Sequence, residues 1–360
     1  MTEKRSTGKN TFARKRSFPK VLLSAAICGT LILLIPGKRV ISKGYNPNAS
    51  PSDSTQMTVN VGVPSINKAT ALYTMEPVAG LVSNENQLKG GLLYDVETKK
   101  ILWQKEMDQP LPIASLTKIM VALLVREDIR DGKTTWETGV KVSREACLIG
   151  GSKINLRFGE VLTIRDLMKS ALIASSNDAA FQLAQYSGGT IQNFVERMNL
   201  RAEALGMKST FFSNPTGMPS PSHATDNHAS PLDLLILSTE LLKYPEITSI
   251  ASCKDGEPVK HGLRTSELRN HNRLVCTYKD EVNGLKTGFT NHAGFCIVAT
   301  TNRRNHRMIS IVLGVKTSYV RNAIVANMVN DYYSLIGLGK MRGANEKGDE
   351  LVQGNEDGER

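Results

Sequence analysis

Residues that commonly mark a metal centre are scarce in this sequence. Its 360 residues include only six histidines and five cysteines. No histidine belongs to a His-Glu-x-x-His pattern, and His223 with His228 is too weak a pair to replace it, which argues against a zinc peptidase. We therefore expect no metal and no cofactor.

Cysteines give no metal-binding spacing either. Cys28 lies inside an apolar stretch. The remaining cysteines are Cys147, Cys253, Cys276 and Cys296. In an oxidising compartment these four could form two disulfides, but we interpret them as unpaired, buried thiols.

The sequence also lacks the basic stripe with interleaved aromatic residues that is typical of nucleic-acid binders. The formal net charge is +11 at pH 7, but it is unevenly distributed. Residues 1–43 contain ten basic residues and one acidic residue, whereas residues 343–360 contain two basic and six acidic residues. Only a mild, scattered excess of positive charge is left for the rest of the chain. We therefore expect no nucleic-acid partner.

No small residues suitable for signal cleavage directly follow the apolar run at residues 21–35. Basic residues flank this run on both sides, a pattern typical of an export signal. The run is long for the core of a signal peptide and short of the roughly 20 residues of a spanning helix. Because the basic charge is heavier before the run, the N-terminus should stay inside. We interpret residues 1–36 as an uncleaved anchor that leaves the rest extracytoplasmic; a cleaved signal and a secreted protein are the alternative.

Three regions follow the predicted anchor. Residues 37–80 are rich in Ser, Asn, Pro and Thr without an apolar period, which predicts a flexible tether to the membrane. Residues 81–340 have the patterning of a folded domain. Residues 341–360 are rich in Gly, Glu and Asp, which predicts a disordered acidic tail.

Hydrophobic periodicity predicts the elements of the first half of the domain. Residues 91–96 and 100–104 read as a hairpin. Apolar residues at three- and four-residue spacing predict a helix after Pro112 that runs to about Glu127. Further helices are expected over residues 163–173, 177–186 and 190–205.

The pattern returns to strands beyond residue 284. Residues 294–301 and 308–315 read as strands joined at Arg304-Asn305, and a last helix is expected over residues 321–336. Strands at both ends of a helical middle predict an α+β fold. In this fold one antiparallel sheet is formed by both ends of the domain, and a helical subdomain is inserted between them.

Ser115-x-x-Lys118 places a hydroxyl and an amine three residues apart on the first predicted helix. Residues at this spacing share a helix face. A serine hydroxyl needs an adjacent base, and lysine can act as one when its pKa is lowered by burial or by a second cation. The spacing also recurs in the basic N-terminal region and in the tether, so the motif alone is weak evidence.

Two further polar elements lie downstream. Ser175-x-Asn177 stands at the junction of two predicted helices, where it could be a helix cap. Lys286-Thr287-Gly288 stands at the start of the returning strands, where it could be a strand end or a bulge. A lysine and a hydroxyl on a strand edge could instead bind a carboxylate, and glycine would let a substrate backbone approach.

The order of these three elements is the signature set of β-lactamases and penicillin-binding proteins. From about residue 90 to residue 333 the chain closely resembles the low-molecular-weight D-alanyl-D-alanine carboxypeptidases, which implies a β-lactamase/transpeptidase-like fold. The runs that carry the resemblance are residues 112–120, 175–180, 214–218 and 284–290.

The resemblance implies a role for each motif residue. Ser115 would attack the carbonyl between the last two D-alanines of a peptidoglycan stem peptide, and Lys118 would take its proton. Ser175 and Asn177 would assist proton transfer and hold the peptide. β-Lactam antibiotics would be covalent inhibitors.

The resemblance also implies where the substrate binds. Lys286 and Thr287 of the Lys-Thr-Gly288 element would bind the terminal carboxylate. The backbone N–H groups of Ser115 and Phe289 would form the oxyanion hole.

One further residue matches the family, and two features of the chain differ from many of its members. Arg321 resembles a family arginine near the carboxylate pocket, although a surface arginine at a helix start is the alternative. Ser176 stands where many members have glycine, a small change that should be tolerated. Many members also have a C-terminal β-rich domain and an anchor helix, whereas this chain ends in an acidic tail, so we expect the N-terminal segment to replace that anchor.

Other functions remain as alternatives. A β-lactamase would share the three motifs, but no Glu-x-x-Leu-Asn element follows Ser175-x-Asn177. An endopeptidase that cuts crosslinks would use the same site. A non-catalytic peptidoglycan-binding protein is disfavoured because all the expected reactive residues are present.

Overall fold

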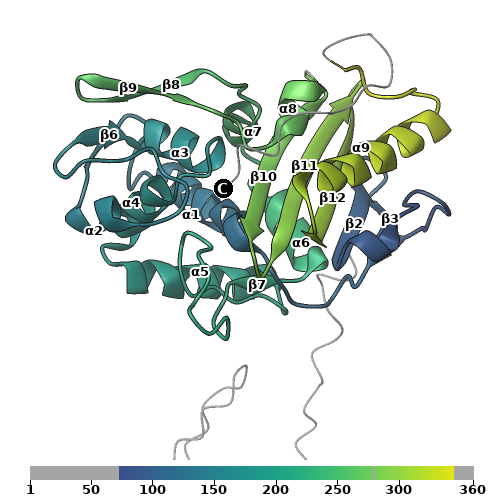
Figure 1. Ribbon diagram of the computed structural model, residues 1–360, viewed down its shortest axis with the longest axis horizontal. Coiled ribbons are helices and arrows are strands. Elements are labelled where there is room, and N and C mark those ends of the chain that lie inside the picture. Colours follow the sequence, from purple (N-terminus) through teal and green to yellow (C-terminus); the bar gives the residue numbers. More distant parts are fainter. Residues whose placement is uncertain (1–72, 279, 344–360) are drawn as a thin grey trace, which may run out of the picture. The chain divides into compact units, whose positions relative to one another are not determined.

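The computed structural model describes residues 73–278 and 280–343 (Figure 1). The predicted anchor and most of the predicted tether and acidic tail lie outside the described residues. Within the described part, no helix is both long and apolar enough to cross a membrane. Ordered structure begins before the predicted tether would end, because strand β1 (Thr74–Met75) pairs in parallel with β3.

One sheet has the strand order β1-β3-β2-β12-β11-β10. Its longer strands are β2 (Gly90–Asp95), β3 (Lys100–Lys105), β10 (Val282–Thr290), β11 (Gly294–Arg303) and β12 (His306–Val315). All pairs of neighbours except β1 with β3 are antiparallel. The N-terminal hairpin β2–β3 joins the C-terminal strands through the pairing of β2 with β12. The prediction of an α+β fold with a sheet formed by both ends is therefore confirmed.

Both faces of this sheet are buried, and strand residues alternate between them. In β11, Val298 belongs to the core shared with the helical region, whereas Ile297 and Ala299 face the second core. Helix α9 (Ser318–Leu335) covers that second face, as Figure 1 shows. This period-two alternation follows from strand geometry and produces three layers: α9, the sheet and the inserted helices.

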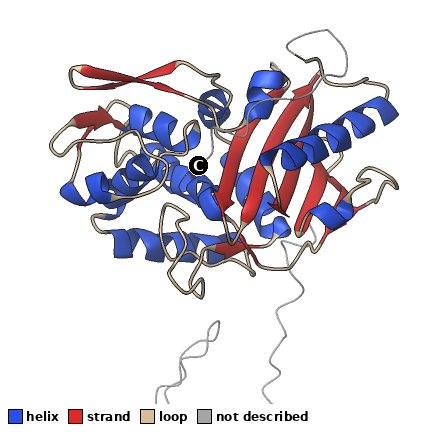
Figure 2. Cartoon of the chain, viewed as in Figure 1, coloured by secondary structure: helices blue, strands red, loops and turns tan. Residues whose placement is uncertain are grey.

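In the sequence the helical region lies between the hairpin and the C-terminal strands, and in Figure 2 most of its helices lie to one side of the sheet. Its helices include α1 (Lys118–Arg130), α2 (Arg144–Leu148), α3 (Ile164–Leu172), α4 (Asn177–Gly188), α5 (Ile191–Leu205) and α6 (Pro231–Leu241). Side-chain caps begin α3 and α5, because the hydroxyls of Thr163 and Thr190 accept hydrogen bonds from backbone N–H groups three residues on. The predicted starts of α3 to α5 are confirmed to within one residue.

Several elements were missing from the sequence-based prediction. They are the two-residue strands β4 (Leu111–Pro112) and β7 (His228–Ala229), the short pair β5 (Gly139–Lys141) and β6 (Val161–Thr163), helices α2 and α6, helix α7 (Pro245–Ala251), the hairpin β8 (Glu257–His261) and β9 (Arg264–Leu268), and helix α8 (Arg273–Thr277). Most of these elements are short. A short element contains too few residues for its hydrophobic period to be recognised.

The four cysteines among the described residues are free thiols. Cys296 is buried, whereas the other three are only partly buried. The interpretation as unpaired thiols is thus confirmed, but the expectation of full burial is wrong for three of them.

Candidate active site

The nucleophile candidate lies on a tight turn rather than inside the first helix. Residues Ala114–Thr117 form a 3-10 turn, and α1 begins at Lys118. The Oγ atom of Ser115 and the Nζ atom of Lys118 are 2.8 Å apart, as the three-residue spacing predicts. Ala114 has a φ angle of 46°, a left-handed conformation that is uncommon for a residue with a side chain. Such strain is typical of functional sites, where the surrounding structure holds the residue in place.

Lys118 is enclosed by oxygen atoms. Its side chain is about as buried as any in the molecule, with 1% of its surface exposed. Besides Ser115, its Nζ atom contacts the Oδ1 atom of Asn177 at 2.7 Å and the carbonyl oxygen of Thr216 at 2.8 Å. An amide oxygen and a carbonyl oxygen only accept hydrogen bonds, whereas a serine hydroxyl can also donate.

These partners fit either protonation state of the amine, because an ammonium can donate to all three oxygens and a neutral amine can donate to Asn177 and Thr216 alone. A neutral lysine has two N–H bonds and one lone pair, so both bonds can be donated to Asn177 and Thr216. The lone pair then faces Ser115, whose hydroxyl can donate its proton to it. In the neutral state the arrangement places a hydrogen-bond acceptor next to the serine, which is what activation of a hydroxyl requires.

Electrostatics favour the same protonation state. Burial lowers the pKa of Lys118 well below its usual range, and the positive charge of Lys286 lowers it further. The carboxylate of Asp178 acts in the opposite direction. Asp178 is itself held by backbone N–H groups of Ile154 and Leu156, at 3.3 and 3.0 Å. The sequence analysis gave two causes that would lower the pKa of Lys118, burial and a second cation. The structure contains both.

The second motif lies at the junction between α3 and α4, as predicted. Asn177 donates its Nδ2 hydrogen to the carbonyl oxygen of Gly150 at 2.9 Å, which turns its Oδ1 atom toward Lys118. Ser175 is 5% exposed and has a φ angle of 56°. Ser176 occupies the cap position of α4, yet its side chain accepts no cap hydrogen bond. The interpretation of this element as a helix cap is therefore not supported by the geometry.

The third motif lies inside a strand. Strand β10 starts at Val282, earlier than expected, so Lys286, Thr287 and Gly288 are in its middle rather than at its start. β10 pairs with β11 on one side only and contacts the 3-10 turn of Ser115 on the other. Lys286 and Thr287 are buried, with 1% and 5% of their surfaces exposed.

Gly288 is required by packing against the nucleophile turn. A Cβ atom at this position would lie 2.8 Å from the carbonyl oxygen of Ile113 and 3.1 Å from the backbone nitrogen of Ser115. The register irregularity of β10 lies at residues 282–284, so Gly288 marks neither a strand end nor a bulge. The glycine therefore allows the approach of the chain's own turn at Ser115, whereas the sequence suggested the approach of a substrate backbone. Phe289 follows it and is exposed, stacked on Phe295.

A loop that the sequence analysis did not assign to the site completes it. The Oδ1 atom of Asn214 accepts hydrogen bonds from the backbone N–H groups of Thr216 and Gly217, which shapes the loop that presents the Thr216 carbonyl to Lys118. Asn227 ties this loop to the nucleophile turn by donating to the Thr117 hydroxyl at 2.8 Å. The run of residues 214–218 carried a resemblance, but nothing in the sequence alone pointed to Asn227.

His271 is another neighbour of the site that the sequence did not reveal. Its backbone N–H donates to the carbonyl oxygen of Ile173 at 3.0 Å, next to the second motif. Burial, together with the positive charges of Lys286, Lys118 and Arg321, lowers its pKa to about 4. The imidazole is therefore neutral near pH 7, in a field made positive by the surrounding cations.

Arg321 lies in the first turn of α9 and is 1% exposed, so the alternative of a surface arginine is wrong. Its guanidinium donates to the Oδ1 atom of Asn322 and lies 5.9 Å from the ring centroid of Phe295. Because its charge affects His271, Arg321 belongs to the same electropositive region as Lys286.

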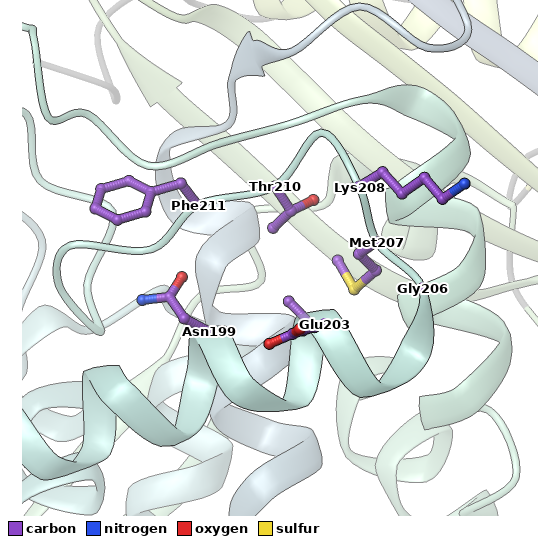
Figure 3. Close-up of a pocket in the computed structure, with 8 residues that line it drawn as sticks. Asn199, Glu203, Gly206, Met207, Lys208, Thr210 and Phe211 are labelled. Atoms are coloured by element: carbon purple, nitrogen blue, oxygen red, sulfur yellow. The ribbon is translucent and has the colours of Figure 1, made fainter. Parts of the chain in front are cut away.

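A separate hollow of about 530 Å³ lies beside the end of α5 (Figure 3). Its lining residues are Asn199, Ala202, Glu203, Gly206, Met207, Lys208, Thr210 and Phe211. None of them is a predicted site residue, and they do not place a nucleophile beside a base. The hollow is therefore a weaker candidate for the active site than the cluster around Ser115.

Comparisons with known proteins identify the family of the chain. The sequence pattern of the D-alanyl-D-alanine carboxypeptidase family matches residues 82–317. The D-alanyl-D-alanine carboxypeptidase DacF of Bacillus subtilis is 34% identical over 277 residues, which cover 77% of this chain and 70% of DacF. A D-alanyl-D-alanine endopeptidase of Pseudomonas aeruginosa is 31% identical over 263 residues, which cover 72% of this chain and 82% of that protein.

The structure is similar to that of penicillin-binding protein D2 from Listeria monocytogenes in its ampicillin-bound form. The two share 29% identity with a TM-score of 0.60, over 68% of this chain and 96% of the other. The predicted β-lactamase/transpeptidase-like fold is confirmed. Fold, matched residues and identity lead to the same conclusion: the chain belongs to the D-alanyl-D-alanine carboxypeptidase family of serine peptidases.

Proposed function

We propose that this protein removes the terminal D-alanine from peptidoglycan stem peptides that end in D-Ala-D-Ala, through an acyl-enzyme on Ser115. The observation that carries the proposal is the position of Lys118. Its buried amine lies 2.8 Å from the Ser115 hydroxyl, and its other two partners only accept hydrogen bonds. The proposed steps use only side chains and backbone groups of the chain itself.

The first half of the reaction forms the acyl-enzyme. Lys118 takes the proton of the Ser115 hydroxyl while the Oγ atom attacks the carbonyl carbon between the two D-alanines. The negative charge on the carbonyl oxygen is stabilised by the backbone N–H groups of Ser115 and Phe289. When the C–N bond breaks, the leaving D-alanine receives the proton through Lys118, with Ser175 and Asn177 assisting the transfer.

The second half hydrolyses the ester. A water molecule loses a proton to the same base and attacks the acyl carbon, and the proton returns to the Ser115 oxygen as the peptide leaves. The products are D-alanine and a peptide shortened by one residue. Lys118 is neutral again at the end of each cycle, so the enzyme neither gains nor loses a proton.

Substrate binding would use the positive charges beside β10. Lys286, Thr287 and Arg321 suit the free carboxylate of the terminal D-alanine, because buried cations bind a carboxylate more strongly than exposed ones. Strand β10 leaves one edge toward the Ser115 turn, where an extended peptide can add to the sheet. β-Lactams would acylate Ser115 in the same place.

The carboxypeptidase reaction has one rival on the same residues. The likeness to the Pseudomonas aeruginosa protein supports a D-alanyl-D-alanine endopeptidase, which cuts a crosslink rather than a free end. The likeness to DacF supports a carboxypeptidase. The requirement for a free carboxylate distinguishes the two, and the charges of Lys286 and Arg321 favour the carboxypeptidase.

The decisive experiment has two parts. Fluorescent penicillin should label the purified protein covalently, and Ser115→Ala should abolish labelling while the circular dichroism spectrum is unchanged. Incubation with a pentapeptide ending in D-Ala-D-Ala should release D-alanine faster than a crosslinked peptide dimer is cleaved. Labelling that persists in Ser115→Ala would remove this serine from its role, and cleavage of the dimer alone would establish the endopeptidase.

The location of the enzyme is part of the same proposal. A peptidase acting on peptidoglycan works outside the cytoplasmic membrane, and residues 1–36 would tether it there with residues 37 onward as a spacer. Mass spectrometry of the mature N-terminus tests the tether. A chain that starts after residue 37 would show a cleaved signal and a secreted enzyme instead.

A further inference from the structure

Two histidines and an aspartate, none of them part of the three sequence motifs, meet beside the turn between β10 and β11. The Oδ2 atom of Asp226 lies 2.9 Å from the Nδ1 atom of His223 and 2.8 Å from the Nδ1 atom of His292. The two imidazole rings are close, with centroids 4.4 Å apart and a tilt of 36°. One ligand atom from each of the three residues lies within 4.8 Å of the other two.

The aspartate is positioned by its surroundings. Asp226 is 7% exposed, and its Oδ1 atom accepts hydrogen bonds from the backbone N–H and the hydroxyl of Ser220, at 2.6 and 3.1 Å. Because Oδ1 is held by Ser220, Oδ2 is turned toward the two imidazoles.

The geometry points to a binding site for a divalent transition-metal ion of the zinc type, with the Nδ1 atoms of His223 and His292 and the Oδ2 atom of Asp226 as ligands. Two imidazoles and one carboxylate are a donor set that zinc accepts. The nitrogen ligands disfavour calcium and magnesium, which prefer oxygen atoms. The site was not predicted from the sequence, which paired His223 with His228 instead.

The present spacing is close to that of a bound site. In a tetrahedral zinc site with bonds of roughly 2.0–2.1 Å, neighbouring ligand atoms are about 3.3 Å apart. The nitrogen-to-oxygen distances of 2.8 and 2.9 Å are those of hydrogen bonds, so entry of the ion needs the side chains to separate by a few tenths of an ångström. Each ring would then carry its proton on Nε2. Three protein ligands leave a fourth position for water.

The ion would join two segments that are far apart in the sequence. His292 lies in the turn between β10 and β11, whereas His223 and Asp226 lie in the loop before β7. Asn227, next to Asp226, ties that loop to the nucleophile turn. A bound metal would therefore stiffen the end of β10 and the loop behind Ser115 without touching the reacting atoms.

Zinc binding to the EDTA-treated full-length protein in detergent tests the proposal. Isothermal titration with Zn²⁺ should give one site per chain, and Zn²⁺ should raise the melting temperature because it binds the folded state. Co²⁺ in the same site should give a visible absorption spectrum. His292→Gln and His223→Gln should each weaken Zn²⁺ affinity by more than the about 10- to 100-fold typical of a lost supporting partner.

Two further variants make the test specific. Ser220→Ala removes one of the two hydrogen bonds to Oδ1 of Asp226 and should weaken affinity by at most about 10-fold. His306→Gln is the matched control, because His306 contacts the Oδ2 atom of Asp95 at 3.0 Å without a second imidazole. It should leave Zn²⁺ binding unchanged. Absence of stoichiometric binding by the unaltered protein, or equal affinity in His292→Gln, would show that the cluster is only a hydrogen-bonded clasp.

Discussion

The two ends of helix α1 both carry buried charged residues, but their surroundings differ. At the first end, Lys118 contacts a hydroxyl, an amide oxygen and a carbonyl oxygen. At the other end, the carboxylate of Glu127 pairs with Arg201 at 2.6 Å and that of Asp128 pairs with Arg197 at 2.8 Å. Among the described residues, no carboxylate lies within ion-pair distance of Lys118.

Both ends oppose the helix dipole. The dipole disfavours a cation at the first turn and anions at the last turn, so neither end is a favourable place for its own charges. At the last turn, arginines of α5 compensate the carboxylates, and the charges remain. At the first turn no carboxylate contacts the lysine, and burial together with the charge of Lys286 outweighs the opposing charge of Asp178, so the lysine tends to lose its proton. The same kind of burial therefore produces an ion-pair cluster at one end and a lysine with a lowered pKa at the other.

Of the changes that test this difference between the two ends of α1, Lys118→Arg should have the largest effect, a loss of acylation rate. A guanidinium stays protonated at any working pH and cannot take the serine proton. Acylation by fluorescent penicillin should slow by about 10²- to 10⁴-fold, the usual contribution of a general base. Stopped-flow or gel-based labelling rates measure it. Lys133→Arg, just beyond the other end of α1, is the control and should keep the normal rate; an active Lys118→Arg enzyme would refute the assignment of the base.

Asp128→Asn should affect stability instead of chemistry. It weakens the contacts of Asp128 with Arg197 and Lys133, at 2.8 and 3.1 Å, and should lower the free energy of unfolding by about 2 kcal/mol. Urea unfolding measures the loss, and the acylation rate of the folded protein should be unchanged. Asp131→Asn, at an exposed ion pair, should have little effect. A large loss of acylation in Asp128→Asn would mean that the two ends are coupled.

Lys286→Met should also weaken binding of the substrate carboxylate, but its effect on the comparison between the two ends of α1 is the smallest: a shift in the pH dependence of the acylation rate. Acylation requires neutral Lys118, so its rate rises as pH increases through the pKa of this lysine. The charge of Lys286 lowers that pKa, so its removal raises the pKa and moves the rising limb of the pH profile to higher pH. Exposed Lys316 changed to Met should leave the midpoint in place. A midpoint that stays constant or falls in Lys286→Met would contradict the assigned interaction.

The fold was predicted where the sequence pattern is long and regular. The hairpin β2–β3, the pair β11–β12 and helices α3 to α5 have clear periods or caps, and the structure places them within a few residues of the expected bounds. The region from α6 to α8 was not predicted. Its helices are short or apolar all round, and the β8–β9 hairpin is held by partners that are distant in the sequence, such as the pairing of Arg264 with Glu160.

The site was predicted in part for a similar reason. Order and spacing brought out Ser115, Lys118, Asn177 and Lys286, and the structure places the first three in contact. Asn227 and His271 escaped notice because an isolated asparagine or histidine has no distinctive spacing. Their roles depend on which residues from distant parts of the sequence pack against them in the folded chain.

The sequence by itself determined that Ser115 and Lys118 are neighbours, because a three-residue spacing on a helical turn brings two side chains to one face. It also determined which residue types reach the site, since the three motifs occur in a fixed order. Only the tertiary structure decided which proton state Lys118 favours. Its pKa depends on burial and on the charge of Lys286, which the sheet brings to the opposite wall of the site from a remote part of the chain. Likewise, only folding brought His292 to Asp226.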